Sequence, residues 1–231
     1  MERCVKQELL DDMPPDDPRA VWSRGDLLRA NAWMGHRGIM ARVLLATCPG
    51  PGPRHLVDLG TGDGRFLQGV ARRLRPDWQG TSVVLLDRQN VVSPATCQGF
   101  AALGWRATPL QADTLEWVRQ PDTPACDAII ANLSLHHFTE AQLADLLRGA
   151  AQVAPVFIAI EPRRAVRCLF FTRLIWLIGC NEVTRHDAPI SVHAGFTGQE
   201  MSRLWPAGPG WSLTERRAGV FSHLFIAQRR E

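Results

Sequence analysis

The sequence predicts an α/β protein built on a mostly parallel sheet, and three observations support this prediction. Short apolar runs alternate with helical patterns between residues 55 and 162, an order typical of a parallel sheet covered by helices. Two further β-type runs near the C-terminus, WSLTERRAG and HLFIAQRR, are separated only by VFS and predict an antiparallel hairpin that closes the sheet edge. Apolar residues make up 45% and charged residues 21% of the chain, as in an ordinary globular protein.

The predicted core elements follow one another in a regular order. The five β-type runs before the hairpin read HLVDLG, TSVVLLD, ATPLQAD, DAIIANLSL and VFIAIEP. The longest helical patterns between them read DGRFLQGVARRL, SPATCQGFAALG and TEAQLADLLRGAAQVA. With the hairpin, the pattern predicts a sheet with helices on both faces.

Segments on both sides of this core predict additions to the sheet. The first 53 residues are helical and end at CPGPGP, and after Pro162 the chain has an apolar helix and the irregular-looking stretch NEVTRHDAPISVHAGF. A short helix, TGQEMSRLW, follows. We expect a helical N-terminal cap at 1–53 and a main domain at 54–231, in which 163–200 form an apolar helix and a substrate lid.

Charge and cysteine usage narrow the class of protein. The formal net charge is only +3 and the arginines are scattered, so nucleic acid is not an expected partner. The six cysteines lie far apart, without zinc-site spacing, and the N-terminus lacks the apolar core of a signal peptide. The longest apolar stretch, CLFFTRLIWLIGC, is too short to cross a bilayer. We expect a cytoplasmic monomer or homodimer without stable membrane insertion.

The segment VDLGTGDGRF at residues 57 to 66 follows the first predicted strand and opens a helix. Because its three glycines have no side chains, a ligand can approach the backbone of this segment closely. The dinucleotide pattern G-x-G-x-x-G fails, because Arg65 or Leu67 occupies the third glycine position. The pattern present is D-x-G-x-G-x-G, from Asp58 to Gly64, and it resembles motif I of the class I S-adenosylmethionine-dependent methyltransferases.

This resemblance implies a Rossmann-like, seven-stranded sheet and a cofactor, S-adenosylmethionine, that leaves as S-adenosylhomocysteine. Asp58 would face the ammonium group of the methionine moiety, where a pyrophosphate would be repelled. Asp87 would accept the ribose hydroxyls, and Asp113 would bind the adenine amino group. A helix or turn cap is the alternative role for these last two aspartates. The resemblance gives these cofactor-binding residues, including neighbours: Asp58, Gly60, Thr61, Gly62, Gly64, Asp87, Arg88, Asp113, Thr114, Asn132 and Leu133.

The fourth strand ends in NLSLHHF, which the resemblance places beside the sulfonium. His136 or His137 would act as a catalytic base on the acceptor, or would contact backbone at the start of the next helix. The segment lacks the D/N-P-P-Y/F motif of adenine and glutamine amino-methyltransferases and the nucleophilic cysteine of RNA cytosine-C5 enzymes. It offers no carboxylate of the kind that metal-dependent catechol enzymes need, which leaves Glu161 isolated, so we expect no metal.

His186 and His193 are further candidates for the catalytic base, since a histidine with a pKa near ~6.5 accepts a phenolic proton at neutral pH. Asp187 is more simply interpreted as a brace for its loop. The acceptor would lie under two helical segments, DLLRANAWMGHRGIMARVL and VRCLFFTRLIWLIG. The candidate substrate-binding residues are Trp33, Met34, Phe170, Phe171 and Trp176. Packing of the two helices against each other is the alternative for each of these side chains.

These observations predict an O-methyltransferase that acts on a hydroxyl of a small hydrophobic phenolic or enolic metabolite. The arrangement resembles bacterial methyltransferases of the ubiquinone and menaquinone type and their relatives in phenolic polyketide pathways. Two alternatives stay open. One is carbon or nitrogen methylation of a similar molecule, and the other is a regulatory module that binds the cofactor without turnover.

Overall fold

A seven-stranded sheet forms the centre of the computed structural model, which describes residues 1–74, 78–206, 208 and 210–230. The strand order is β3-β2-β1-β4-β5-β7-β6; β1 to β5 are parallel, and β7 runs antiparallel to both β5 and β6. The predicted mixed sheet with its C-terminal hairpin is therefore confirmed. The strands are β1 (His55–Leu59), β2 (Ser82–Asp87), β3 (Arg106–Gln111), β4 (Ala128–Asn132), β5 (Val156–Pro162), β6 (Trp211–Ala218) and β7 (Ser222–Arg229).

Helices cover both faces of the sheet, because the central strands are apolar on both sides. The neighbouring residues Ile129 and Ile130 of β4 are both fully buried, and each belongs to a different hydrophobic core. One core includes side chains of α3 (His36–Thr47), α4 (Arg65–Ala71) and α5 (Pro94–Ala101). The other includes side chains of α6 (Thr114–Arg119), α7 (Glu140–Val153) and α10 (Glu200–Leu204).

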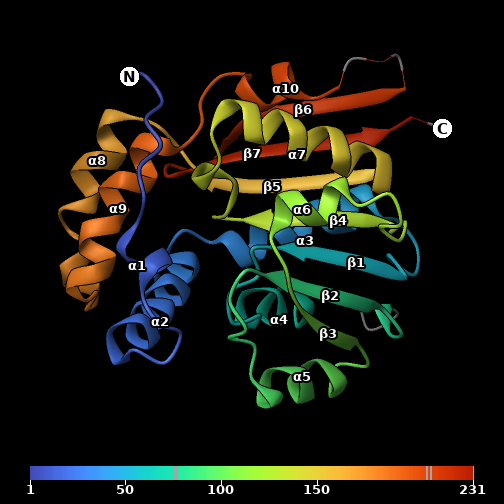
Figure 1. Cartoon of the computed structure of the whole chain (residues 1–231), viewed down its shortest axis with the longest axis horizontal. Coiled ribbons are helices and arrows are strands. Elements are labelled where there is room, and N and C mark those ends of the chain that lie inside the picture. The colour runs from blue at the N-terminus through green and yellow to red at the C-terminus, as the bar shows by residue number, and fades with distance from the viewer. Residues whose placement is uncertain (75–77, 207, 209, 231) are drawn as a thin grey trace.

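The remaining helices gather beside one end of the sheet (Figure 1). They are α1 (Leu9–Asp12), α2 (Pro18–Trp33), α8 (Val166–Thr172) and α9 (Glu182–Ala194), together with the 3₁₀ helices η2 (Leu135–His137) and η3 (Ile175–Ile178). Helix α9 packs against α1, α2 and α8, so the N-terminal segment and the segment after β5 form one roof. The boundary at residue 53 between a cap and a main domain stays a prediction.

The structure corrects the prediction of an irregular segment after residue 180. Residues 182–194 form the helix α9, even though Pro189 lies inside it and lacks a backbone donor. The Asn181 side chain accepts a hydrogen bond from the Thr184 backbone nitrogen and caps the helix at its N-terminus. Val183 and Val192 are buried along its inner side, so packing stabilises a helix that local sequence alone does not predict.

Two predicted helices are also shorter than expected. The segment before residue 48 divides into α2 and α3 at Gly35, which has the left-handed value φ = 72°. The stretch CLFFTRLIWLIGC divides into α8 and η3. Among the residues that the structure describes, no helix is both long enough and apolar enough to cross a membrane.

A buried histidine ties the N-terminal helices to the sheet. His36 at the start of α3 makes contacts of 2.8 Å from Nδ1 to Asn132 Oδ1 and of 2.6 Å from Nε2 to Ser222 Oγ. Asn132 Nδ2 in turn donates to Asn31 Oδ1. Burial lowers the pKa of His36 to about 4, against a smaller raising effect of the Asn132 hydrogen bond, so the ring is neutral at physiological pH.

We expect His36→Ala to lower the free energy of unfolding by about 2–3 kcal/mol, because the change leaves a cavity and two buried polar partners unpaired. Urea denaturation at pH 7.5 measures the loss. The depressed pKa means that the contribution of His36 is full above pH 6.5 and declines toward pH 4, so the difference between wild type and variant should shrink on acidification. The exposed His55 gives a matched control, His55→Ala, and an equal loss in both variants would contradict the anchoring role.

Candidate functional site

The glycine loop connects β1 to α4 at the point where the strand order reverses between β1 and β4. Gly60, Gly62 and Gly64 all have positive φ, between 58° and 75°. A Cβ atom on Gly60 would lie 2.5 Å from the Cβ of Ser134, so the close approach of the segment after β4 requires glycine there. A Cβ on Gly62 would meet nothing within 4 Å, so at this residue the bare backbone faces open space that a ligand could fill.

A cavity of about 100 Å³ lies at this loop. Six of the residues that the sequence assigned to the cofactor line it: Asp58, Gly60, Thr61, Gly62, Asn132 and Leu133. The other five are not among its lining residues: Gly64, Asp87, Arg88, Asp113 and Thr114. The sequence motif therefore locates the cavity, and six of the eleven predicted residues line it.

Asp58 is the buried carboxylate of the cavity. Thr61 Oγ1 donates a hydrogen bond of 2.7 Å to Asp58 Oδ2. Burial raises the pKa of Asp58 to about 7, which outweighs the lowering effect of the Thr61 hydrogen bond, and the charge of Asp87 raises it further. A buried carboxyl group that is poised between its two protonation states is well suited to a cationic ligand.

Asp87 lies at the carboxyl end of β2 and holds the glycine loop. Its Oδ2 accepts a hydrogen bond of 2.8 Å from the Gly62 backbone nitrogen, and its Oδ1 accepts one of 2.9 Å from the Gln89 nitrogen. A carboxylate has about four acceptor positions, so Asp87 can still receive the hydroxyls of a ribose. The neighbouring Arg88 is exposed, and its Nη2 atom lies 3.6 Å from Asp11 Oδ1 of α1.

Asp113 is the N-cap of α6, which is the alternative role considered for it. Its Oδ1 accepts hydrogen bonds from the backbone nitrogens of Leu115 and Glu116, at 2.8 and 3.0 Å. Among the described residues, Asp113 Oδ1 accepts both of these hydrogen bonds and Asp113 Oδ2 accepts none. Oδ2 can therefore still accept a hydrogen bond from a ligand. Thr114 is the first residue of α6.

Leu133 follows β4 with φ = 56°, which makes it the one non-glycine residue with positive φ among those that the structure describes. A side chain rarely adopts this conformation, and such outliers cluster at ligand sites. The Leu133 backbone nitrogen donates to the Ile160 carbonyl of β5 at 2.9 Å, which fixes the turn. The side-chain amide of Asn132 is occupied by His36 and Asn31, as described above.

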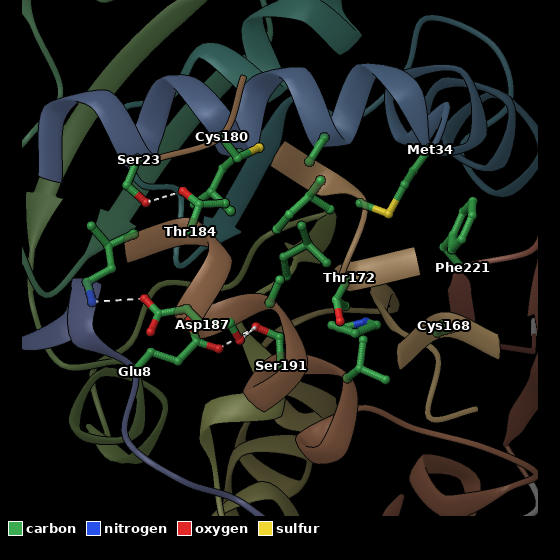
Figure 2. Close-up of a pocket in the computed structure, with 18 of the residues that line it drawn as sticks. Glu8, Ser23, Met34, Cys168, Thr172, Cys180, Thr184, Asp187, Ser191 and Phe221 are labelled. Atoms are coloured by element: carbon green, nitrogen blue, oxygen red, sulfur yellow. Dashed lines mark hydrogen bonds between the residues drawn. The ribbon is translucent and has the colours of Figure 1, made fainter. Parts of the chain in front are cut away.

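A second cavity, of about 190 Å³, lies between the roof helices and the carboxyl ends of β4 and β5 (Figure 2). One water molecule needs about 10–15 Å³ of such space, so the cavity is large enough for a small organic molecule. Its walls are mainly apolar, and Leu27 and Leu133 line both this cavity and the one at the glycine loop. The two cavities are therefore neighbours that meet at these two leucines.

Three of the five predicted substrate-binding residues line this second cavity: Trp33, Met34 and Phe171. The other two lie at the surface and are not among its lining residues; Phe170 is 59% exposed and Trp176 is 56% exposed. Sequence reasoning missed the apolar wall residues Leu27, Ile175, Ile178 and Phe221. Phe221 packs against Trp33, with ring centroids 4.7 Å apart, although the two residues are far apart in the sequence.

One end of the second cavity is polar and contains Glu8, His136 and His137. His136 is only 3% exposed, with Nδ1 2.8 Å from Glu161 Oε2 and Nε2 3.3 Å from Glu8 Oε1. Burial lowers the pKa of His136, but the hydrogen bonds to Glu161 and Glu8 and the charges of both raise it to about 10. The role of Glu8 was not predicted, because nothing in the sequence near it points to His136.

The structure also corrects the view of Glu161 as an isolated carboxylate. Glu161 is fully buried in β5, and its Oε1 accepts hydrogen bonds from the backbone nitrogens of Ser134 and Leu135, at 3.0 and 2.9 Å. Burial raises the pKa of Glu161, but the hydrogen bonds and the charge of His136 outweigh this and lower it. Glu161 therefore fixes the segment after β4 and sets the orientation of the His136 ring.

The remaining predicted histidines differ in their surroundings. His137 has Nδ1 3.2 Å from Asp11 Oδ2 and lines the second cavity. His186 and His193 are exposed and are not among the residues that line it. Asp187 accepts hydrogen bonds from the backbone nitrogens of Leu9 and Leu10, so it does act as a brace, and what it holds is the N-terminal segment.

Comparison with known proteins identifies this architecture. Residues 56–155 match a family model described as a methyltransferase domain. By this match, residues 56–155 are a methyltransferase domain. The matched range holds the glycine loop, Asp87, Asp113 and η2, so the methyltransferase domain contains the residues on which the resemblance was based. A search of curated protein sequences found no significant match.

Solved structures share the fold of this methyltransferase at low sequence identity. The plantazolicin methyltransferase BpumL, in complex with S-adenosylhomocysteine (SAH), is 14% identical with a TM-score of 0.63, and the match covers 93% of this chain and 92% of that one. An O-methyltransferase family protein from Burkholderia thailandensis is 18% identical (TM-score 0.57, 92% of this chain). The mitomycin 7-O-methyltransferase MmcR is also 18% identical (TM-score 0.57, 93% of this chain). The chain spans 62% and 58% of these last two proteins.

Proposed function

We propose that this methyltransferase transfers the methyl group of S-adenosylmethionine to a hydroxyl group of a small hydrophobic phenolic or enolic metabolite. The observation that carries the proposal is the pair of adjoining cavities, one at the glycine loop and one under the roof helices, which meet at Leu27 and Leu133. A methyl donor in the first cavity would direct its reactive carbon toward an acceptor in the second.

The charges around the first cavity suit S-adenosylmethionine. Asp58 would pair with the ammonium group of the methionine moiety, and the backbone at Gly62 would allow the cofactor to approach closely. Asp87 would accept the ribose hydroxyls while it keeps its bond to the Gly62 nitrogen. The free Oδ2 of Asp113 would accept the adenine amino group. BpumL, which shares this fold, has been solved with SAH.

The composition of the second cavity suits an apolar acceptor with one polar end. Trp33, Met34 and Phe171 would contact the apolar part of the acceptor, and its hydroxyl would lie toward His136 and His137. Alignment of donor and acceptor away from water can supply up to ~7–11 kcal/mol of the acceleration in favourable systems. MmcR, which shares this fold, methylates an oxygen according to its name, and this supports oxygen as the acceptor atom here.

Calorimetry of the purified chain with S-adenosylmethionine, and separately with NAD, tests the cofactor part of the proposal. Binding of S-adenosylmethionine with no response to NAD is expected. Turnover is then measured with a panel of phenols, and mass spectrometry locates the added methyl group. Methylation only at carbon or nitrogen would overturn the acceptor assignment, and binding of NAD alone would overturn the whole proposal.

Replacement of Asp87 by alanine should weaken S-adenosylmethionine binding by tenfold or more, since hydrogen bonds to a charged acceptor contribute about 1.5–3 kcal/mol. Asp87→Asn provides a milder change, because its amide oxygen can still accept from the Gly62 nitrogen while the charge is lost. Calorimetry measures both variants beside the exposed control Asp122→Ala. Unchanged affinity in Asp87→Ala would rule out the ribose role.

A further inference from the structure

Three side chains from two distant parts of the chain meet at the polar end of the second cavity. Glu8 precedes α1, whereas His136 and His137 belong to η2. Each can offer one donor atom, and these atoms all lie within 4.8 Å of one another. We propose that Glu8, His136 and His137 bind a divalent transition-metal ion such as Zn²⁺.

His136 is oriented as a metal ligand would be. Its Nδ1 lies 2.8 Å from the buried carboxylate of Glu161 and donates a proton there. Burial lowers the pKa of the ring, but the two glutamates raise it to about 10, so a metal ion that binds Nε2 would displace the proton on that nitrogen. This Nε2 atom is buried and has Glu8 Oε1 as its nearest acceptor at 3.3 Å, in a geometry poorer than that of the Nδ1 contact. Metal-binding histidines typically donate their other nitrogen to a carboxylate, which fixes the tautomer and the ring.

His137 also has a carboxylate beside its Nδ1 atom. Its Nδ1 lies 3.2 Å from the carboxylate of Asp11, which leaves Nε2 as its nitrogen ligand. The two imidazole rings lie against each other, with centroids 4.2 Å apart. The site therefore consists of two imidazoles, each supported by a carboxylate, and the third carboxylate of Glu8.

The spacing of the donor atoms fits a small ion. Bonds of about 2.0–2.2 Å to nitrogen and oxygen place tetrahedral ligands about 3.3 Å apart. The 3.3 Å separation of His136 Nε2 and Glu8 Oε1 already has this value. One ligand atom of each side chain lies within 4.8 Å of the others, and movement of the His137 side chain, which is 28% exposed, would bring the three closer together.

The charges around the site favour a cation with affinity for imidazole. Glu8, Asp11 and Glu161 bring three carboxylates to this end of the cavity. The nearby cations are Arg3, which donates to the carbonyls of His136 and Phe138, and Arg88, 3.6 Å from Asp11. Mg²⁺ and Ca²⁺ prefer sites made only of oxygen, whereas two histidines and one carboxylate are a typical ligand set for Zn²⁺.

With three protein ligands, a tetrahedral ion would have one further position for an acceptor oxygen. A hydroxyl group held there would release its proton to solvent more readily, and its oxygen would attack the methyl group as the methyl–sulfur bond breaks and S-adenosylhomocysteine leaves. This catalytic role rests on the proposed function, whereas metal binding itself does not. The proposal also departs from the sequence-based expectation of a metal-free enzyme, which did not include Glu8.

Zn²⁺ titration of the full chain, after treatment with a chelator, tests the proposal by calorimetry. One ion per chain should bind, and Co²⁺ in its place should show the visible absorption of a tetrahedral site. Glu8→Gln keeps a partner for the Ser191 hydroxyl (Figure 2) and, like His137→Ala, should weaken binding by at least about tenfold. His55→Ala, at the start of β1, should bind as wild type does.

Circular dichroism verifies that each variant folds. If His136→Ala, which removes the buried ligand, fails to fold, the Zn²⁺ affinity of His137→Ala decides the outcome. Absence of stoichiometric Zn²⁺ binding, or unchanged affinity in both Glu8→Gln and His137→Ala, would overturn the proposal and leave Glu8, His136 and Glu161 as a chain of ion pairs. S-adenosylmethionine binding is measured on the same preparations. Cofactor binding without Zn²⁺ binding refutes the metal site alone, and the reverse result refutes the proposed function alone.

Discussion

Replacement of Glu161 by alanine should lower the free energy of unfolding by about 3–5 kcal/mol, as expected when one partner of a buried ion pair is removed. Glu161 accepts hydrogen bonds from the Ser134 and Leu135 backbone nitrogens and from the His136 ring, and all of these groups would lose their partner. The segment after β4 would then lose the contacts that fix it beside the glycine loop. Urea denaturation with a circular dichroism signal measures the change.

Two further variants show whether the effect comes from the buried charge. Glu161→Gln keeps the size of the side chain and an acceptor for the backbone, so its loss should lie between wild type and Glu161→Ala. The exposed Glu182 at the start of α9 provides the control Glu182→Ala, which should cost no more than about 1 kcal/mol. A loss below 1 kcal/mol in Glu161→Ala would show that these hydrogen bonds do not stabilise the fold.

The sheet was predictable from the sequence, because its signals are local. The central strands carry apolar runs, and the successive residues Ile129 and Ile130 of β4 face opposite sides of the sheet and are both buried, as a covered parallel strand requires. The glycine loop was predictable for a similar reason, since Gly60 and Gly62 are needed within one short turn. Helix α9 was not predictable, because its stability depends on the burial of Val183 and Val192 against other elements and Pro189 argues locally against it.

The acceptor side of the site was only partly predictable. The sequence points to apolar helices but not to their orientation, so it does not show that Phe171 lines the cavity while its neighbour Phe170 lies at the surface. The contacts of Glu8 with His136 and of Asp187 with Leu9 join residues that are far apart in the sequence. Such contacts leave no local pattern, because they depend on the N-terminal segment folding over the sheet.

Replacement of Asp58 by asparagine should weaken S-adenosylmethionine binding by at least about thirtyfold. Loss of one partner of a buried charge pair costs about 2–5 kcal/mol, and each 1.4 kcal/mol is tenfold in Kd. Asparagine keeps an oxygen that can accept the hydrogen bond of Thr61, so the loop should stay in place. The carboxylate charge is the main feature removed, and calorimetry at pH 8 measures its contribution.

The pH dependence of binding separates this charge from a purely structural role. Burial raises the pKa of Asp58 to about 7 in the cofactor-free protein, so at pH 6 most molecules carry a neutral side chain that must release its proton to pair with an ammonium group. Wild-type affinity should therefore increase as the pH rises from 6 to 8, with proton release on binding near pH 6, and Asp58→Asn should lack both effects.

The same pKa also affects the stability of the fold. A raised carboxyl pKa stabilises the folded state at low pH, and this stability is lost as the pH rises through about 7. Asp58→Asn should therefore unfold no more easily than wild type at pH 8. Equal affinities of wild type and variant at pH 8, or a wild-type affinity that does not change with pH, would show that Asp58 does not receive the cationic end of the cofactor.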